Sequence, residues 1–323
     1  MNQRSVLTTT EGTAQQVSWL PMVVIAMAQF LMSYNVAALA MSIGPMVTTY
    51  NTSATTVGTA IVVYSLMVAG FVMLGGKLGE HLGSKRVFQA MVILFGAAMV
   101  IVTFSPTATI LVAAQGLAGA AASALVPTLV VLIAANFRGT QQAKALGLLG
   151  AACALAGVTG FLAAGILGTL ISWRCAFALL IPVAITAFCL SFKLKPVHPR
   201  PDVSIDAAGA VLAAASILLI SFGFNGFTRW GILIANPNAP FDIFGLSPAP
   251  AIVILGIVSG QAFLAWSRRR QGARKPPLLA LEVIESGPER SAVFAMFIIV
   301  ALSACINFLL PLYIMIVQGR TSL

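Results

Sequence analysis

The side chains in this sequence that could perform acid, base or metal chemistry lie almost entirely outside its long apolar stretches. Both histidines, His81 and His198, and seven of the eight carboxylates fall in polar connecting segments, and Asp206 lies at the edge of an apolar stretch. The carboxylates are Glu11, Glu80, Asp202, Asp206, Asp242, Glu282, Glu285 and Glu289. No Ser/His/Asp set, paired carboxylate or zinc-type spacing occurs within an apolar stretch, so we do not expect an enzyme.

The four cysteines offer no metal chemistry either. Cys153, Cys175, Cys189 and Cys305 lie far apart, in or beside apolar stretches, with no CxxC or Cys/His spacing. Small apolar packing residues are the simplest interpretation of this pattern. We therefore predict no bound metal and no cofactor.

The composition identifies the solvent around the chain. Of its 323 residues, 59% are hydrophobic and 8% are charged, with a mean hydropathy of +0.99. A soluble domain carries roughly 25% charged residues, which are needed to cover its surface. The sequence therefore predicts a lipid bilayer as the main partner. The net charge of +10 lies in short loops and lacks the aromatic and basic surface typical of nucleic-acid binding.

Nine apolar stretches are long enough to cross a membrane as helices, since about 20 residues span a core of ~30 Å. Residues 1–16 form a polar tail, and the first stretch is too long for a cleaved signal peptide. The predicted helices cover residues 17–47, 56–76, 87–104, 107–135, 145–170, 176–192, 207–227, 248–266 and 291–317.

The basic residues indicate the orientation of these helices. With a cytoplasmic N-terminus, fifteen of the eighteen Lys and Arg residues fall in inner segments, and three fall outside: Arg174, Arg229 and Arg320. This asymmetry is the one that membrane proteins show. We predict a multi-pass protein of the cell inner membrane.

The connecting segments divide the predicted helices into groups. After the tail, residues 17–192 form a six-helix bundle, followed by a cytoplasmic connector at 193–206 and two inserted helices at 207–267. A basic cytoplasmic loop at 268–290 precedes residues 291–323, the first helix of a second, incomplete bundle. The predicted fold class is thus an all-α membrane protein.

The segment between the second and third predicted helices, residues 76–86, reads GKLGEHLGSKR. It resembles the G-x-L-A-D-R-x-G-R-K pattern of the major facilitator superfamily, specifically its fourteen-helix drug:proton antiporter branch. Gly76 allows close helix approach, Gly83 allows a tight turn, and Glu80 can face a basic side chain. The resemblance implies a gating loop made of Gly76, Glu80, Gly83, Lys85 and Arg86.

Two further segments carry the resemblance. Residues 111–119 (LVAAQGLAG) keep the family glycine at Gly119, but Gln115 stands where the family has an arginine implicated in proton coupling. Residues 157–165 (GVTGFLAAG) keep part of the antiporter glycine pattern. The small residues Gly119, Gly157, Gly160 and Gly165 are expected to pack helices closely.

The family fold also implies where a substrate binds. Its first and fourth helices line a central cavity, and the ninth helix here corresponds to the first cavity helix of the second half. This implies Asn35, Gln115 and Asn307 as cavity contacts. Hydrogen bonds between helices are the alternative role for these polar side chains.

The resemblance implies secondary active efflux of small molecules such as drugs, coupled to protons, by alternating access. It covers about nine of fourteen expected helices, which suggests truncation after the ninth helix or a separate polypeptide carrying the remaining helices. The alternative is a non-transporting membrane fragment or scaffold. No acid lies at membrane depth in this half, so the coupling group would lie in the second half or be something other than a carboxylate.

Overall fold

The computed structural model describes residues 18–196, 199, 206–237, 245–273 and 286–316, and within them it is helical apart from turns and one isolated bridge. Within these described residues, eight segments are long and apolar enough to cross a membrane. The helices are α1 (Leu20–Met41), α2 (Ile43–Tyr50), α3 (Ala54–Leu82), α4 (Ser84–Thr103), α5 (Ala108–Asn136), α6 (Thr140–Leu170), α7 (Trp173–Ala178), α8 (Leu180–Ser191), α9 (Ala207–Trp230), α10 (Pro248–Gly272) and α11 (Gly287–Ile316).

Two of the predicted helices are each divided in two. The stretch predicted at 17–47 breaks at Ser42, between α1 and α2, and the stretch predicted at 176–192 begins at Trp173 and breaks at Leu179. In both cases a proline follows three residues after the break, at Pro45 and Pro182. Proline has no N–H to donate to the carbonyl four residues earlier, so the helix is interrupted there.

Side-chain oxygens mark where several helices begin. Ser53, Thr107, Ser172 and Ser247 each accept a hydrogen bond from a backbone N–H in the first turn of α3, α5, α7 and α10. These bonds satisfy N–H groups that have no partner within the helix. The spans are thus delimited by local chemistry as well as by hydropathy.

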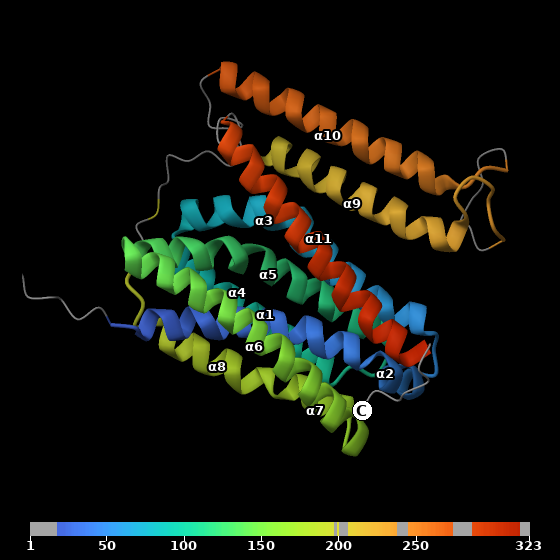
Figure 1. Ribbon diagram of the computed structural model, residues 1–323, viewed down its shortest axis with the longest axis horizontal. Helices are drawn as coiled ribbons and strands as arrows, with labels where there is room; N and C mark the ends of the chain where they lie inside the picture. The colour runs from blue at the N-terminus through green and yellow to red at the C-terminus, as the bar shows by residue number, and fades with distance from the viewer. Residues whose placement is uncertain (1–17, 197–198, 200–205, 238–244, 274–285, 317–323) are drawn as a thin grey trace, which may run out of the picture.

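The first six spans form one bundle around a continuous apolar core (Figure 1). Within it, α3 packs along α5, α1 along α6, and α4 against both α5 and α8. Residues of α1 and α5 supply much of the buried core, which identifies them as central helices.

Helices α9 and α10 lie to one side of this bundle (Figure 1). Figure 1 shows α9 and α10 as an antiparallel pair, and α9 packs against α3. The contact is apolar, with Ala210, Ala213 and Phe263 against Met73 and Leu74 of α3. The side chains described for α11 are exposed, so none of them joins the buried core.

Candidate functional site

The predicted gating loop is almost entirely helical, and this corrects its interpretation as a loop. Helix α3 continues to Leu82 and α4 begins at Ser84, so Gly76 and Glu80 lie in α3 while Lys85 and Arg86 lie in the first turn of α4. Gly83 alone joins the two helices, with φ 92° and ψ 123°. This positive φ favours glycine, as the sequence predicted for a tight turn.

Glu80 and Lys85 at this joint both have partners within the bundle. Glu80 forms an ion pair with Lys77 on its own helix, and Lys77 Nζ lies 3.0 Å from Glu80 Oε2. Lys85 donates to two backbone carbonyls just beyond the end of α8, with Nζ 2.8 Å from the oxygen of Phe192 and 2.7 Å from that of Leu194. A cation at a helix C-terminus is favourable because those carbonyls carry partial negative charge. Lys85 therefore ties the start of α4 to the end of α8.

A shallow pocket of about 250 Å³ opens beside the joint. Its lining residues are Leu82, Gly83, Lys85, Arg86, Gln89, Pro196 and Pro199. The side chain of Arg86 is exposed there.

A matching contact closes the opposite end of α4. Arg174, in the first turn of α7, donates to the carbonyl oxygens of Thr103 and Ser105, with Nη2 2.8 Å from Ser105. Its guanidinium lies 4.7 Å from the ring centroid of Trp173, a distance suited to a cation–π interaction. Lys85 thus binds carbonyls at the C-terminal end of α8, and Arg174 binds carbonyls at the C-terminal end of α4. Sequence analysis placed Arg174 in an outer segment and did not identify these partners.

Close helix approach occurs at Gly75, one residue before the predicted Gly76. A Cβ added to Gly75 would come within 2.5 Å of the Cα of Ala124 in α5, whereas one at Gly76 would meet Pro127 at an ordinary 3.6 Å. Gly119 of α5 does face α3 closely, since an added Cβ would lie 2.5 Å from the carbonyl oxygen of Tyr64.

The three glycines predicted on α6 differ in their surroundings. Gly160 approaches α1, where an added Cβ would lie 2.9 Å from both the carbonyl oxygen of Tyr34 and the Cβ of Ala37. Gly165 is buried. A Cβ added to Gly157 would meet no described atom outside its own stretch of helix within 4 Å. The packing expectation therefore agrees with the geometry at Gly160 and fails at Gly157 for the described part of the chain.

Two of the three candidate cavity residues bind each other. Asn35 of α1 and Gln115 of α5 exchange two hydrogen bonds, with Nδ2 2.9 Å from Oε1 and Nε2 3.0 Å from Oδ1, and both side chains are 0% exposed. This geometry favours the interhelical contact that the sequence left as an alternative to cavity lining. The side chain of Asn307, in α11, lies outside the described residues.

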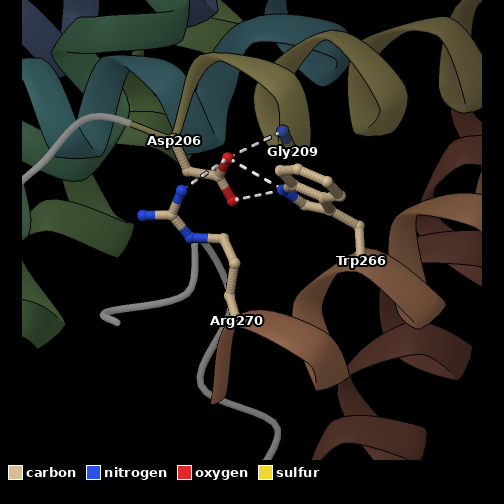
Figure 2. A network of polar contacts seen from close by, with 4 residues as sticks. All are labelled: Asp206, Gly209, Trp266 and Arg270. Atoms are coloured by element: carbon tan, nitrogen blue, oxygen red, sulfur yellow. Dashed lines mark hydrogen bonds and ion pairs between the residues drawn. The ribbon is translucent and has the colours of Figure 1, made fainter. Parts of the chain in front are cut away.

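A buried carboxylate that sequence reasoning did not select joins α9 to α10. Asp206 is 2% exposed and caps α9 by accepting from the N–H of Gly209 at 3.0 Å. Figure 2 shows it also accepting from the indole Nε1 of Trp266, at 3.0 and 3.2 Å, and pairing with Arg270 at 3.4 Å. The signal available in the sequence was a lone acid at the edge of an apolar stretch.

Metal binding has no support in the described residues, among which no cluster of three His, Cys, Asp or Glu side chains could hold an ion.

Comparison with known proteins gives a family match over nearly the whole chain. Residues 25–321 match the Major Facilitator Superfamily. The multidrug efflux pump LfrA of Mycolicibacterium smegmatis is 27% identical over 95% of this chain and 58% of its own length. The puromycin resistance protein pur8 of Streptomyces alboniger is 27% identical over 83% of this chain and 51% of its own length. The lincomycin resistance protein of Streptomyces lincolnensis is 25% identical over 80% of this chain and 51% of its own length.

The chain thus spans about half the length of the curated relatives it matches. Among solved structures, the POT family transporter PepTSo has a TM-score of 0.52 at 13% identity, over 80% of this chain and 55% of that one. A mutant of the peptide transporter POT in complex with alafosfalin also has a TM-score of 0.52 at 13% identity, over 80% of this chain and 69% of that one. At this identity the likeness concerns the fold.

Proposed function

We propose that this chain, which belongs to the Major Facilitator Superfamily, supplies the first six-helix bundle and the linker hairpin of a drug-efflux transporter of the fourteen-helix drug:proton antiporter branch. The family and the relatives identify a transporter rather than an enzyme. The observation that carries the efflux proposal is the alignment of 95% of the chain with a multidrug efflux pump.

Alternating access is the proposed mechanism, and the bundle has parts suited to rigid-body motion. Lys85 and Arg174 hold helix ends inside the bundle, so α4, α7 and α8 would move together. Gly83 provides a single-residue joint between α3 and α4. Rocking needs two bundles around a central site, and the described part of this chain contains one. We therefore expect the 323 residues alone not to transport.

Proton coupling is the proposed energy source, with the coupling group outside the central pair. Gln115 stands where the family has an arginine, and its partner Asn35 is also uncharged, so this pair gains no charge on proton uptake. A coupled carrier needs a group that does change charge. We propose that it lies in the second half of the transporter.

Puromycin export from an efflux-deficient bacterium tests this proposal, because one relative is named a puromycin resistance protein. Cells would express the 323 residues alone, or the same chain joined to the part of LfrA beyond its matched region. We expect export only from the joined protein, and loss of export on adding a protonophore. The rival role as a membrane scaffold predicts no export from the joined protein although it reaches the membrane. Export by the 323 residues alone would contradict the need for a second bundle.

A further inference from the structure

Three consecutive arginines lie near the inner end of α10, and only one of them faces into the protein. Figure 2 shows Arg270 turned toward the buried Asp206, with which it pairs at 3.4 Å. Arg268 and Arg269 are exposed, and neither side chain has a hydrogen-bond or ion-pair partner among the described residues. Two unpaired cations are thus presented at the outside of the α9–α10 pair.

The helical period accounts for this division, because α10 runs unbroken through all three arginines. Arg270 lies seven residues after Phe263, close to two full turns, and Phe263 packs on the side of α10 that faces α9 and α3. The other side of α10 carries an exposed stripe of four aliphatic residues, Ile254, Leu255, Ile257 and Val258. Arg268 and Arg269 each lie fourteen residues after the first two of these, close to four full turns, and so continue the exposed stripe.

The two exposed arginines lie at the depth of lipid headgroups. Arg268 follows Pro248, the first residue of α10, by twenty positions, or ~30 Å at about 1.5 Å per residue. This length matches the hydrocarbon core of a bilayer. Trp266 and Arg270 both bind Asp206, so the inner end of α10 is held on α9 at this level. The exposed stripe therefore runs along the acyl chains and ends at two guanidinium groups among the phosphates.

The surroundings of these arginines favour an anionic headgroup over a zwitterionic one. Residues 268–275 read RRRQGARK, with five cations, and no Asp or Glu occurs between residues 243 and 281. Asp206 already accepts from Gly209, Trp266 and Arg270, so it is not available to a headgroup ammonium. Positive charge is expected on any inner connector. Its continuation of an exposed apolar stripe on an unbroken helix is a separate feature that topology does not require.

We propose that Arg268 and Arg269 bind the phosphate of an anionic phospholipid of the inner leaflet, whose acyl chains lie along the exposed stripe of α10. A guanidinium group presents paired N–H donors that match phosphate oxygens. The bound lipid joins the α9–α10 pair to the bilayer on one side, while Arg270 and Asp206 join α10 to α9 on the other. This inference goes beyond the export proposal and does not rest on it.

Photocrosslinking of the full 323-residue chain in phosphatidylcholine vesicles tests this surface. The vesicles contain a small fraction of phosphatidylglycerol with a photoreactive group on its acyl chain close to the headgroup, and peptide mass mapping locates the label. We expect labelling of the exposed Leu264 and Ala265, one turn before the arginines. Excess unlabelled phosphatidylglycerol should abolish this labelling, whereas excess phosphatidylcholine or inorganic phosphate should not.

Two competition results would overturn the proposal. Equal competition by phosphatidylcholine would show contact with acyl chains and no recognition of the headgroup. Competition by inorganic phosphate would show a site for the free ion and not for a lipid. Both are measured on the unaltered chain, so they decide the matter even if a variant fails to fold.

A charge-matched pair of variants separates this surface from the effect of net charge. Arg268→Gln/Arg269→Gln should lower the labelling at least about tenfold, since each cation near an anionic membrane strengthens binding by about fivefold. Arg138→Gln/Lys144→Gln removes two exposed cations at the start of α6 and should change it by less than about twofold, because distant exposed charges are screened. Equal losses in the two variants, or unchanged labelling in the first, would contradict the assignment.

The outcome is distinguishable from that of the export experiment. Labelling that depends on Arg268 and Arg269, without puromycin export by the joined protein, supports the lipid surface and contradicts the export proposal. Export by the joined protein, with labelling that phosphatidylcholine competes equally, contradicts the lipid surface and leaves the export proposal standing.

Discussion

The Asn35–Gln115 pair shows how a polar contact is satisfied inside the bundle. Each amide supplies one donor and one acceptor to the other, so neither is left unpaired at 0% exposure. The sequence identified both residues as polar groups at membrane depth. It could not show that they meet, because they lie 80 positions apart and their pairing depends on how α1 crosses α5.

Removing the side-chain amide of either Asn35 or Gln115 should lower the free energy of unfolding by more than half of the loss caused by removing both. Asn35→Ala or Gln115→Ala leaves a buried amide unpaired, and we expect a loss of about 1–2 kcal/mol in the free energy of unfolding for each. The double variant should lose about 1 kcal/mol less than the two single losses added together, because no buried amide is then left without a partner. Denaturant unfolding in detergent of the parent, the two single variants and the double variant measures these free energies. Simple additivity would show that the two amides do not interact.

Asp206 has four polar contacts with three residues and should be more sensitive. In Asp206→Asn the side chain keeps its shape but loses its charge beside Arg270, so we expect α9–α10 to be destabilised by roughly 2–3 kcal/mol. Trp266→Phe removes only the indole N–H and should cost about 1 kcal/mol. Proteolysis of the α9–α10 pair in vesicles reports both changes. Equal protection of Asp206→Asn and the parent protein would contradict a structural role for this carboxylate.

At the scale of helices, hydropathy predicted the spans well but not their joints. Every predicted stretch coincides with a helix or a pair of helices, because lipid requires each backbone to satisfy its own hydrogen bonds. The breaks at Ser42 and Leu179 were missed although Pro45 and Pro182 were visible in the sequence. The α3–α4 joint was predicted as a loop because its charged residues lower hydropathy without ending the helix.

Helix approach at Gly119 gives a prediction with an internal control. Gly119→Ala would place a methyl group 2.5 Å from the carbonyl oxygen of Tyr64, so α3 and α5 must separate. Overpacking of this kind typically costs about 1–3 kcal/mol. Gly147→Ala meets nothing within 4 Å and should stabilise by up to about 1 kcal/mol through helix propensity. Thermal unfolding compares the two. A Gly119→Ala protein as stable as Gly147→Ala would refute the close α3–α5 contact.

The tie between α4 and α8 can be tested in the same way. Lys85→Met removes both hydrogen bonds to the carbonyls at the end of α8, and we expect a loss of about 1–2 kcal/mol. Arg86→Met removes the neighbouring charge, whose side chain is exposed, and should change stability by less than about 0.5 kcal/mol. Denaturant midpoints of the two variants give the comparison. If Arg86→Met is as destabilising as Lys85→Met, the effect is one of net charge and not of this contact.

At the scale of the whole molecule, the six-span bundle is one packed unit, and the α9–α10 pair lies against its α3. The family match extends across these parts and into α11. The order of these parts was predictable from hydropathy and from the basic connectors. The position of α9 beside α3 was not, because apolar helix faces of similar composition carry no signal for their partner.

The transporter assignment depends on these spans alternating across a bilayer with the basic connectors on the cytoplasmic side. Single cysteines introduced at Arg138, Lys195, Pro106 and Ile232, with the native cysteines replaced, can be probed in intact cells with an impermeant maleimide. We predict labelling at Pro106 and Ile232, and labelling at Arg138 and Lys195 only after the membrane is opened. Labelling of all four positions in intact cells, or of the opposite pair, would contradict the orientation on which the whole account rests.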